Sequence, residues 1–166
     1  DTKPEAISGG YAFWEEADKT PVEITSIDGL TLRGEYCRCE NPKRNIICVH
    51  GYRADGISNF AAVLPDFMAM DSNILLIDQR ACGKSQGNVI TFGVNESRDC
   101  LTWVNFLVEH FGKDVKIILT GISMGASTVM MAAARGVPSN VIGILADCGY
   151  SSQEKIIKKL IKDMKL

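Results

Sequence analysis

The sequence lacks long hydrophobic runs and lacks a strong excess of either charge. No apolar stretch approaches the about 20 residues that a helix needs to cross a bilayer, and residues 1–20 have neither the basic start nor the apolar core of a signal peptide. With 18 basic and 20 acidic residues, the chain has no field that would attract nucleic acid or an anionic membrane. We therefore expect neither partner and a cytoplasmic location, although an N-terminal anchor removed before Asp1 is also compatible with the sequence.

The sequence also lacks the cysteine pattern of a disulfide scaffold. Its six cysteines lie in periodic apolar segments, not in the loops of a core-poor chain. Most are therefore interpreted as small buried side chains with free thiols. Cys37 and Cys39 share one face of a strand, but no second Cys or His pair with zinc spacing accompanies them. We expect no metal ion and no cofactor.

What is present is the composition of one globular domain, with 46% hydrophobic residues in 166. Two alternating segments, 22–27 and 30–39, flank Asp28-Gly29, which predicts an antiparallel hairpin with a two-residue turn. Apolar runs without alternation follow, which is typical of strands covered on both faces. These runs are 46–49, 74–77, 116–120 and 141–146.

Helical spacing of apolar residues separates these runs, at 59–70 and at 96–111. Alternation of strands and helices predicts an α/β fold with a mostly parallel sheet, right-handed crossovers and helices on both faces. No internal repeat or linker indicates a second domain. In such sheets, active and binding sites lie in the loops that follow the carboxyl ends of the strands.

The loop after the second run contains Gly83-Lys84-Ser85, which are the last three residues of a phosphate-binding P-loop. A P-loop also needs a glycine five positions before Gly83, where this chain has Asp78. A carboxylate there would place negative charge beside the phosphates, and no further glycine lies between the two positions. A nucleotide-binding α/β protein is therefore a disfavoured alternative.

The loop after the third run reads Gly121-Ile122-Ser123-Met124-Gly125, a G-x-S-x-G pattern followed by a helix rich in small residues. The glycines permit a tight turn in which the serine backbone is strained. We predict that Ser123 is a nucleophile. The alternative is that Ser123 serves only as the N-cap of the helix.

From about Val22 to Ser152 the chain resembles the α/β-hydrolase superfamily. His50-Gly51-Tyr52 is similar to the H-G-x oxyanion segment of that fold, and Gly121 to Gly125 is similar to its nucleophile elbow. Residues 78–85 resemble its D-x-R-G-x-G-x-S loop, with Ala81 and Cys82 as departures. The "GISMGAS" and "ADCGYSS" stretches are most similar to bacterial serine hydrolases.

This resemblance implies a serine hydrolase that acts on small carboxylic esters or related acyl compounds through an acyl-enzyme on Ser123. It implies an oxyanion hole made by the backbone N–H groups of Tyr52 and Met124. A second hypothesis is a non-catalytic α/β-hydrolase domain that binds a ligand or a partner. In either case "GKS" is a structural turn, and Asp78 and Arg80 are interpreted as a loop-stabilising pair.

The base and the acid of a catalytic triad are not assigned. His110 lies near the end of a helix that runs away from the carboxyl edge. The resemblance implies that His50 orients the oxyanion loop, and a role for His50 as the catalytic base is the minor alternative. Asp147 is a minor candidate for the acid, and a carboxylate that accepts N–H bonds from the "CGYSS" turn is the favoured interpretation.

We therefore expect residues 1–166 to be a single truncated α/β-hydrolase domain whose triad is completed by a C-terminal segment of a longer chain. The resemblance implies that acid and histidine mostly follow later strands. A sheet that ended at residues 141–146 would also expose an apolar edge. Residues 152–166 form an amphipathic pattern with many lysines, which we interpret as the start of a lid and not as a membrane-binding helix.

Overall fold

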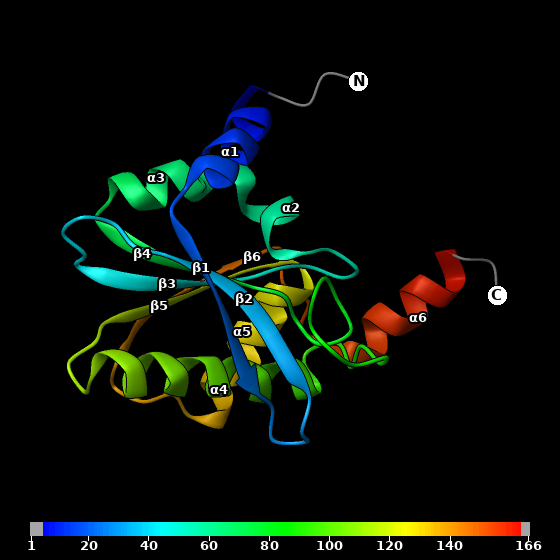
Figure 1. Ribbon diagram of the computed structural model, residues 1–166. Helices are drawn as coiled ribbons and strands as arrows, with labels where there is room; N and C mark the ends of the chain where they lie inside the picture. Colours follow the sequence, from blue (N-terminus) through cyan, green and yellow to red (C-terminus); the bar gives the residue numbers. More distant parts are fainter. Residues whose placement is uncertain (1–4, 164–166) are drawn as a thin grey trace.

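A computed structural model describes residues 5–163 of the chain. Within these residues six strands form one sheet in the order β1-β2-β4-β3-β5-β6 (Figure 1). The strands are β1 Lys19–Thr25, β2 Thr31–Cys37, β3 Arg44–Val49, β4 Ser72–Ile77, β5 Ile117–Ile122 and β6 Val141–Asp147. β2 pairs antiparallel with β1 and with β4, and the other neighbours pair in parallel. The predicted mostly parallel sheet with an antiparallel N-terminal hairpin is confirmed.

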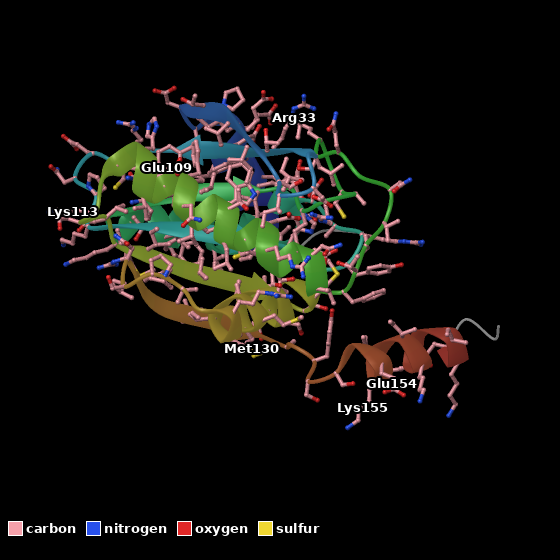
Figure 2. The ribbon with its side chains drawn as sticks, turned by 90° about the horizontal axis from the view of Figure 1, so that it is seen from below. Arg33, Glu109, Lys113, Met130, Glu154 and Lys155 are labelled. Atoms are coloured by element: carbon pink, nitrogen blue, oxygen red, sulfur yellow. The ribbon has the colours of Figure 1, made fainter. Side chains whose placement is uncertain are left out.

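Helices cover both faces of this sheet, as predicted. They are α1 Glu5–Glu16, α2 Gly56–Phe60, the 3₁₀ turn η1 Ala61–Val63, α3 Leu64–Ala69, α4 Val94–Phe111, α5 Met124–Arg135 and α6 Gln153–Asp163. Figure 1 shows α1, α2 and α3 on one face and α4 and α5 on the other. α6 projects away from the sheet (Figure 2).

Two hydrophobic clusters, one on each face, hold the layers together. Trp103 and Leu107 of α4 pack with Leu75 of β4 on one face, and Trp14 of α1 packs with Phe60 on the other. All six residues of β4 are buried. Continuous apolar sequence therefore marks the inner strands correctly, since each of their faces meets a helix layer.

The turn of the hairpin differs from the prediction. Gly29 N–H donates to Ser26 O (2.9 Å) and Ser26 N–H donates to Leu30 O (2.8 Å), so residues 27–29 form a three-residue loop. Gly29 has φ +87°, as expected when a type I turn is followed by a left-handed glycine. The predicted two-residue turn is wrong, because the Asp-Gly pair occupies the second half of a longer loop.

The predicted helix over residues 59–70 is also wrong, because three short elements stand in its place. Asp55 caps the first of them by accepting the Ser58 N–H, and Pro65 begins a new helix because it lacks a backbone N–H. The sequence analysis also missed α1. Gly10 in α1 allows close packing there, since a Cβ would lie 1.7 Å from Ala61 O.

The edge strand β6 is the third difference. Val141 and Ile144 pack against the core beside α5, but the side chains of Ile142 and Leu145 are 54% and 55% exposed. Among the described residues no helix covers the second face of β6. The expectation that β6 is covered on both faces is therefore wrong for this part of the chain.

Candidate active site

Ser123 lies where β5 ends and α5 begins, at the carboxyl edge of the parallel strands. Its backbone has φ +54° and ψ −115°, a conformation that costs a non-glycine residue on the order of 1–3 kcal/mol. The Ser123 residue is exposed. It occupies the N-cap position of α5, but its side chain accepts no capping hydrogen bond. The N-cap alternative therefore gives no reason for a serine at this position.

The two glycines of G-x-S-x-G create this turn through close backbone contacts. A Cβ on Gly121 would lie 2.2 Å from Gly125 O, and a Cβ on Gly125 would lie 1.9 Å from Val49 O. Real Cβ atoms do not approach backbone this closely, so strand β3 and helix α5 can meet only if position 125 has no side chain.

The two predicted oxyanion donors lie on the loop after β3 and at the start of α5, on the two sides of Ser123. A Cβ on Gly51 would be 3.4 Å from Ser123 Cβ, and Tyr52 is the next residue. Met124 is the first residue of α5, so its N–H has no acceptor inside the helix. Gly51 N–H donates to Asn59 Oδ1 (2.6 Å), which fixes the loop after β3.

His50 is fully buried and both of its ring nitrogens have partners. Gln79 N–H donates to Nε2 at 2.9 Å, so Nε2 is an acceptor, and the proton lies on Nδ1, 2.8 Å from Gly51 O. Burial lowers the pKa of His50 and keeps the ring neutral. His50 therefore orients the loop after β3, in agreement with the favoured interpretation, and has no free nitrogen for Ser123.

His110, which the sequence predicts to lie too far from Ser123, and Asp147, the minor candidate for the acid, are placed as follows. His110 lies at the end of α4, at the opposite edge of the sheet, with its ring against Phe106 and Phe111. Asp147 accepts the Ser123 N–H through its backbone oxygen (2.8 Å). Its carboxylate accepts from Cys148 Sγ at 3.2 Å, whereas the expected N–H bonds from the following turn are not observed within residues 5–163.

Ser127 holds that turn instead, a role that the sequence analysis missed. Its Oγ donates to Tyr150 O (3.0 Å) and accepts from Tyr150 N–H (2.8 Å). The Tyr150 hydroxyl donates to Phe92 O (2.8 Å), and the Phe92 ring stacks on Tyr52 at 5.3 Å. Burial raises the pKa of Tyr150 to about 12, so the hydroxyl stays protonated as a donor. No local motif marks these contacts, because they join helix α5 and three separate loops.

Asp78 and Arg80 both stabilise loops, but through other residues and not as a pair. The Asp78 carboxylate accepts from Lys84 N–H (2.8 Å) and Gly56 N–H (3.2 Å). The Arg80 guanidinium binds Asp99 (2.6 Å) and Asp28 (2.8 Å), and its hydrogen bonds to Asp99 raise the pKa of Arg80. A carboxylate fills the turn around "GKS", and no helix begins there, which argues against a P-loop.

Three further features were sought in the described part of the chain: a metal cluster, a membrane-spanning helix and disulfide bonds. Over residues 5–163 no group of three or more His, Cys, Asp or Glu side chains is placed to hold a metal ion. In the same range no helix combines the length and the apolar character needed to cross a membrane. All six cysteines are free thiols, and Cys37, Cys48, Cys82 and Cys100 are buried.

Sequence comparison places this geometry among known proteins. The profile of a family described as "alpha/beta hydrolase fold" matches residues 44–162. The chain is also 26% identical over 151 residues to YqkD of Bacillus subtilis (strain 168), which is described as uncharacterized. That match covers 90% of this chain and 49% of YqkD, so the chain spans about half the length of this relative.

Solved structures show the same fold. The esterase Pf2001 of Pyrococcus furiosus superposes with a TM-score of 0.78 at 25% identity, and the match covers 100% of this chain and 63% of the esterase. The α/β hydrolase GrgF from Penicillium sp. sh18 superposes with a TM-score of 0.72 at 21% identity, over 89% of this chain and 52% of GrgF.

Proposed function

The chain belongs to the α/β-hydrolase family, and from this premise we propose that Ser123 is the nucleophile of a serine hydrolase that acts on carboxylic esters or related acyl compounds. The observation that supports this most is the backbone of Ser123, strained at φ +54° between β5 and α5. Strain of this kind is retained where surrounding structure enforces it, and it is common at functional sites. The esterase named above supports acyl chemistry by its similarity.

The proposed reaction has two steps. Ser123 Oγ attacks the carbonyl carbon of the substrate while a base removes the hydroxyl proton, and the alcohol then leaves with a proton to give an acyl-enzyme. Water hydrolyses this ester and releases the acid. The backbone N–H groups of Tyr52 and Met124 are the proposed donors to the oxyanion.

The proton acceptor must come from elsewhere. His50 is buried with both nitrogens engaged, and His110 lies at the other edge of the sheet, so neither histidine of the chain serves Ser123. We therefore propose that a segment outside the 166 residues supplies the base and the acid. The uncovered apolar face of β6 is a suitable packing surface for such a segment.

Helix α6 is the proposed start of a lid over this site. Its lysines and its isoleucines lie on opposite sides, and Ile157 and Ile161 are exposed. We interpret this exposed apolar face as the surface that would pack against the rest of a lid. Residues 164–166 of the predicted lid lie outside the described residues.

Labelling with a fluorophosphonate, read by intact mass, tests this proposal. We expect rapid labelling of a longer protein that contains this domain together with its C-terminal continuation, and no labelling of its Ser123→Ala variant. The 166-residue chain should fold and stay almost unlabelled, because no base reaches Ser123. Rapid labelling of the short chain would contradict an external base, and an unlabelled longer protein would contradict the nucleophile.

A non-catalytic domain that binds a small ligand or a partner is the second candidate. The specific observation in its favour is that neither histidine of the chain serves Ser123. Hydrolysis of p-nitrophenyl acetate by the longer protein separates the two candidates, since a binding domain would give the same slow rate before and after the Ser123→Ala substitution.

A further inference from the structure

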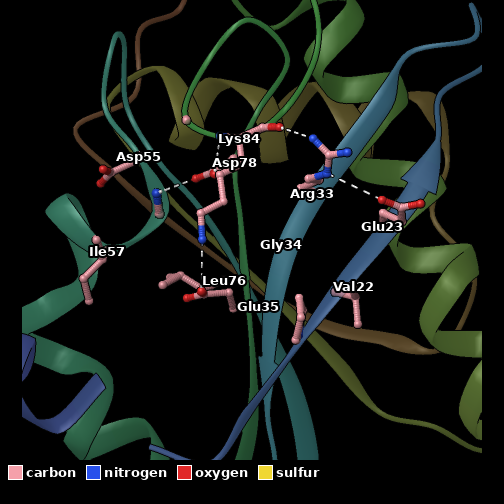
Figure 3. A pocket seen from close by; sticks show the side chains of 13 residues that line it. Val22, Glu23, Arg33, Gly34, Glu35, Asp55, Ile57, Leu76, Asp78 and Lys84 are labelled. Carbon is pink, nitrogen blue, oxygen red and sulfur yellow. Dashed lines mark hydrogen bonds and ion pairs between the residues drawn. The ribbon is translucent and has the colours of Figure 1, made fainter. Parts of the chain in front are cut away.

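A cavity lies on the sheet face that carries α1, α2 and α3 (Figure 3). Its volume is about 430 Å³, within the usual range of small-molecule sites. It is bounded by β1 and β2 on one side, by the start of α2 on another and by the loop after β4. None of its lining residues is Gly51, Tyr52, Ser123 or Met124, so it is not part of the proposed active site.

The floor of this cavity is apolar. Pro21 of β1, Leu76 of β4 and Ile57 of α2 line it. Val22 also borders the cavity, but its side chain packs on the other face of the sheet, against the cluster under α4. The cavity exists because α1 covers only one end of β2, where Trp14 Nε1–H donates to Glu35 (2.8 Å). Farther along β2 the sheet is left open beside Gly34.

The rim of the cavity carries an excess of carboxylates. Four acidic side chains and two basic ones line it, namely Glu23, Glu35, Asp55, Asp78, Arg33 and Lys84. Arg33 lies 3.5 Å from Glu23, and Lys84 Nζ lies 3.5 Å from Glu35. Figure 3 shows the Lys84 side chain extending toward Glu35. The Lys84 side chain is 73% exposed and the Arg33 side chain 47% exposed, so both ion pairs are screened by solvent and weak.

We propose that this cavity binds an amphipathic organic amine, with the alkylammonium group on Glu35 in place of Lys84 and the apolar body on Pro21, Ile57 and Leu76. The apolar floor gives the affinity and the surplus negative charge at the rim selects the cation. Glu35 is held in place by Trp14, so its orientation does not depend on Lys84. This inference does not depend on the proposed function of Ser123.

Tryptamine is a suitable probe, with tryptophol as its neutral counterpart and indole-3-propionate as its anionic counterpart. Binding is followed by NMR through the amide signals of Gly34, Gly56 and Gly83, three glycines that line the cavity. We expect tryptamine to shift these signals with a dissociation constant on the order of 1 mM. Tryptophol should bind at least about five-fold more weakly, and indole-3-propionate should not bind.

Two variants should change the affinity in opposite directions. Glu35→Gln keeps an acceptor for Trp14 but removes the charge, and should weaken tryptamine binding about five-fold. Lys84→Met keeps the aliphatic stem but removes the competing cation, and should strengthen binding by a similar factor. Glu109→Gln, on the exposed side of α4 (Figure 2), is the charge-matched control and should leave the affinity for tryptamine unchanged.

The proposal is overturned if tryptamine leaves the three glycine signals unchanged, if tryptophol binds as well as tryptamine, or if both rim variants change the affinity in the same direction. A general loss of folding cannot imitate the expected result, because Lys84→Met must bind more tightly than the unsubstituted protein.

Discussion

The inner strands and the edge strand β6 have similar sequences and different surroundings. "ILLI" in β4 is buried throughout, whereas Ile142 and Leu145 of β6 are more than half exposed. The two runs differ in their neighbours and not in their composition. Ser123 lies between these regions, since β5 pairs with buried β3 on one side and with β6 on the other. An apolar run therefore predicts that both faces of a strand are buried in the folded protein. It does not predict that the described residues are the ones that bury them.

The largest expected effect concerns the close contact between α5 and the inner strand β3. Gly125→Ala should lower the free energy of unfolding by about 4 kcal/mol, because its Cβ would lie 1.9 Å from Val49 O and would push α5 away from β3. Urea denaturation of the 166-residue chain measures this. The matched control is Gly143→Ala in β6, where the Cβ meets only Ile118 Cγ1 at 3.8 Å. Equal costs at both positions would show that the two regions do not differ in rigidity.

A pair of leucines tests the difference in burial directly. Leu119→Ala in β5 should cost about 3 kcal/mol, because the side chain is fully buried and the variant leaves a cavity. Leu145→Ala in β6 should cost less than about 1 kcal/mol, because over half of that side chain already lies in solvent. Urea denaturation again gives the values. A large cost for Leu145→Ala in the 166-residue chain would mean that the second face of β6 is already covered.

The sequence predicts features that neighbouring residues determine, and it does not predict contacts between residues that are distant in the chain. The inner strands, α4 and the strained turn at Ser123 follow from periodicity and from G-x-S-x-G, because neighbouring residues determine them. Two contacts join residues that are distant in the chain: Ser127 with Tyr150, 23 positions apart, and Arg80 with Asp99, 19 positions apart. No local sequence pattern predicts either contact. α1 was missed because its apolar positions are interrupted by Gly9 and Gly10.

The clamp between α5 and the turn after β6 gives a smaller test. Ser127→Ala should cost about 1–2 kcal/mol, because Tyr150 N–H and Tyr150 O both lose a partner next to a buried position. Hydrogen exchange should show faster exchange of the Tyr150 amide and no change at Thr120, which lies in the inner sheet. Faster exchange at both amides would mean that the turn and the sheet open as one unit.

The smallest expected effect is a pH dependence on the buried side. Because burial lowers the pKa of His50 below its ordinary value of 6.5, the unfolded chain binds a proton there that the folded chain does not. Stability from this group is therefore complete above about pH 6.5 and falls as the pH drops toward the folded pKa. Urea denaturation between pH 7 and pH 5 should show a shallower slope for His50→Gln. An unchanged slope in His50→Gln would contradict the assignment.

The contact of Gly125 with Val49 has a consequence for engineering the site. The backbone turn at Ser123 is set by close contacts among main-chain atoms of β3, β5 and α5, and no loop side chain takes part in them. Tyr52 and Phe92, whose rings stack on each other, can therefore be varied while this turn stays in place. Tyr150 is best kept, because its hydroxyl donates to Phe92 O. If Ser123 is the proposed nucleophile, libraries at the two varied positions should differ mainly in substrate range.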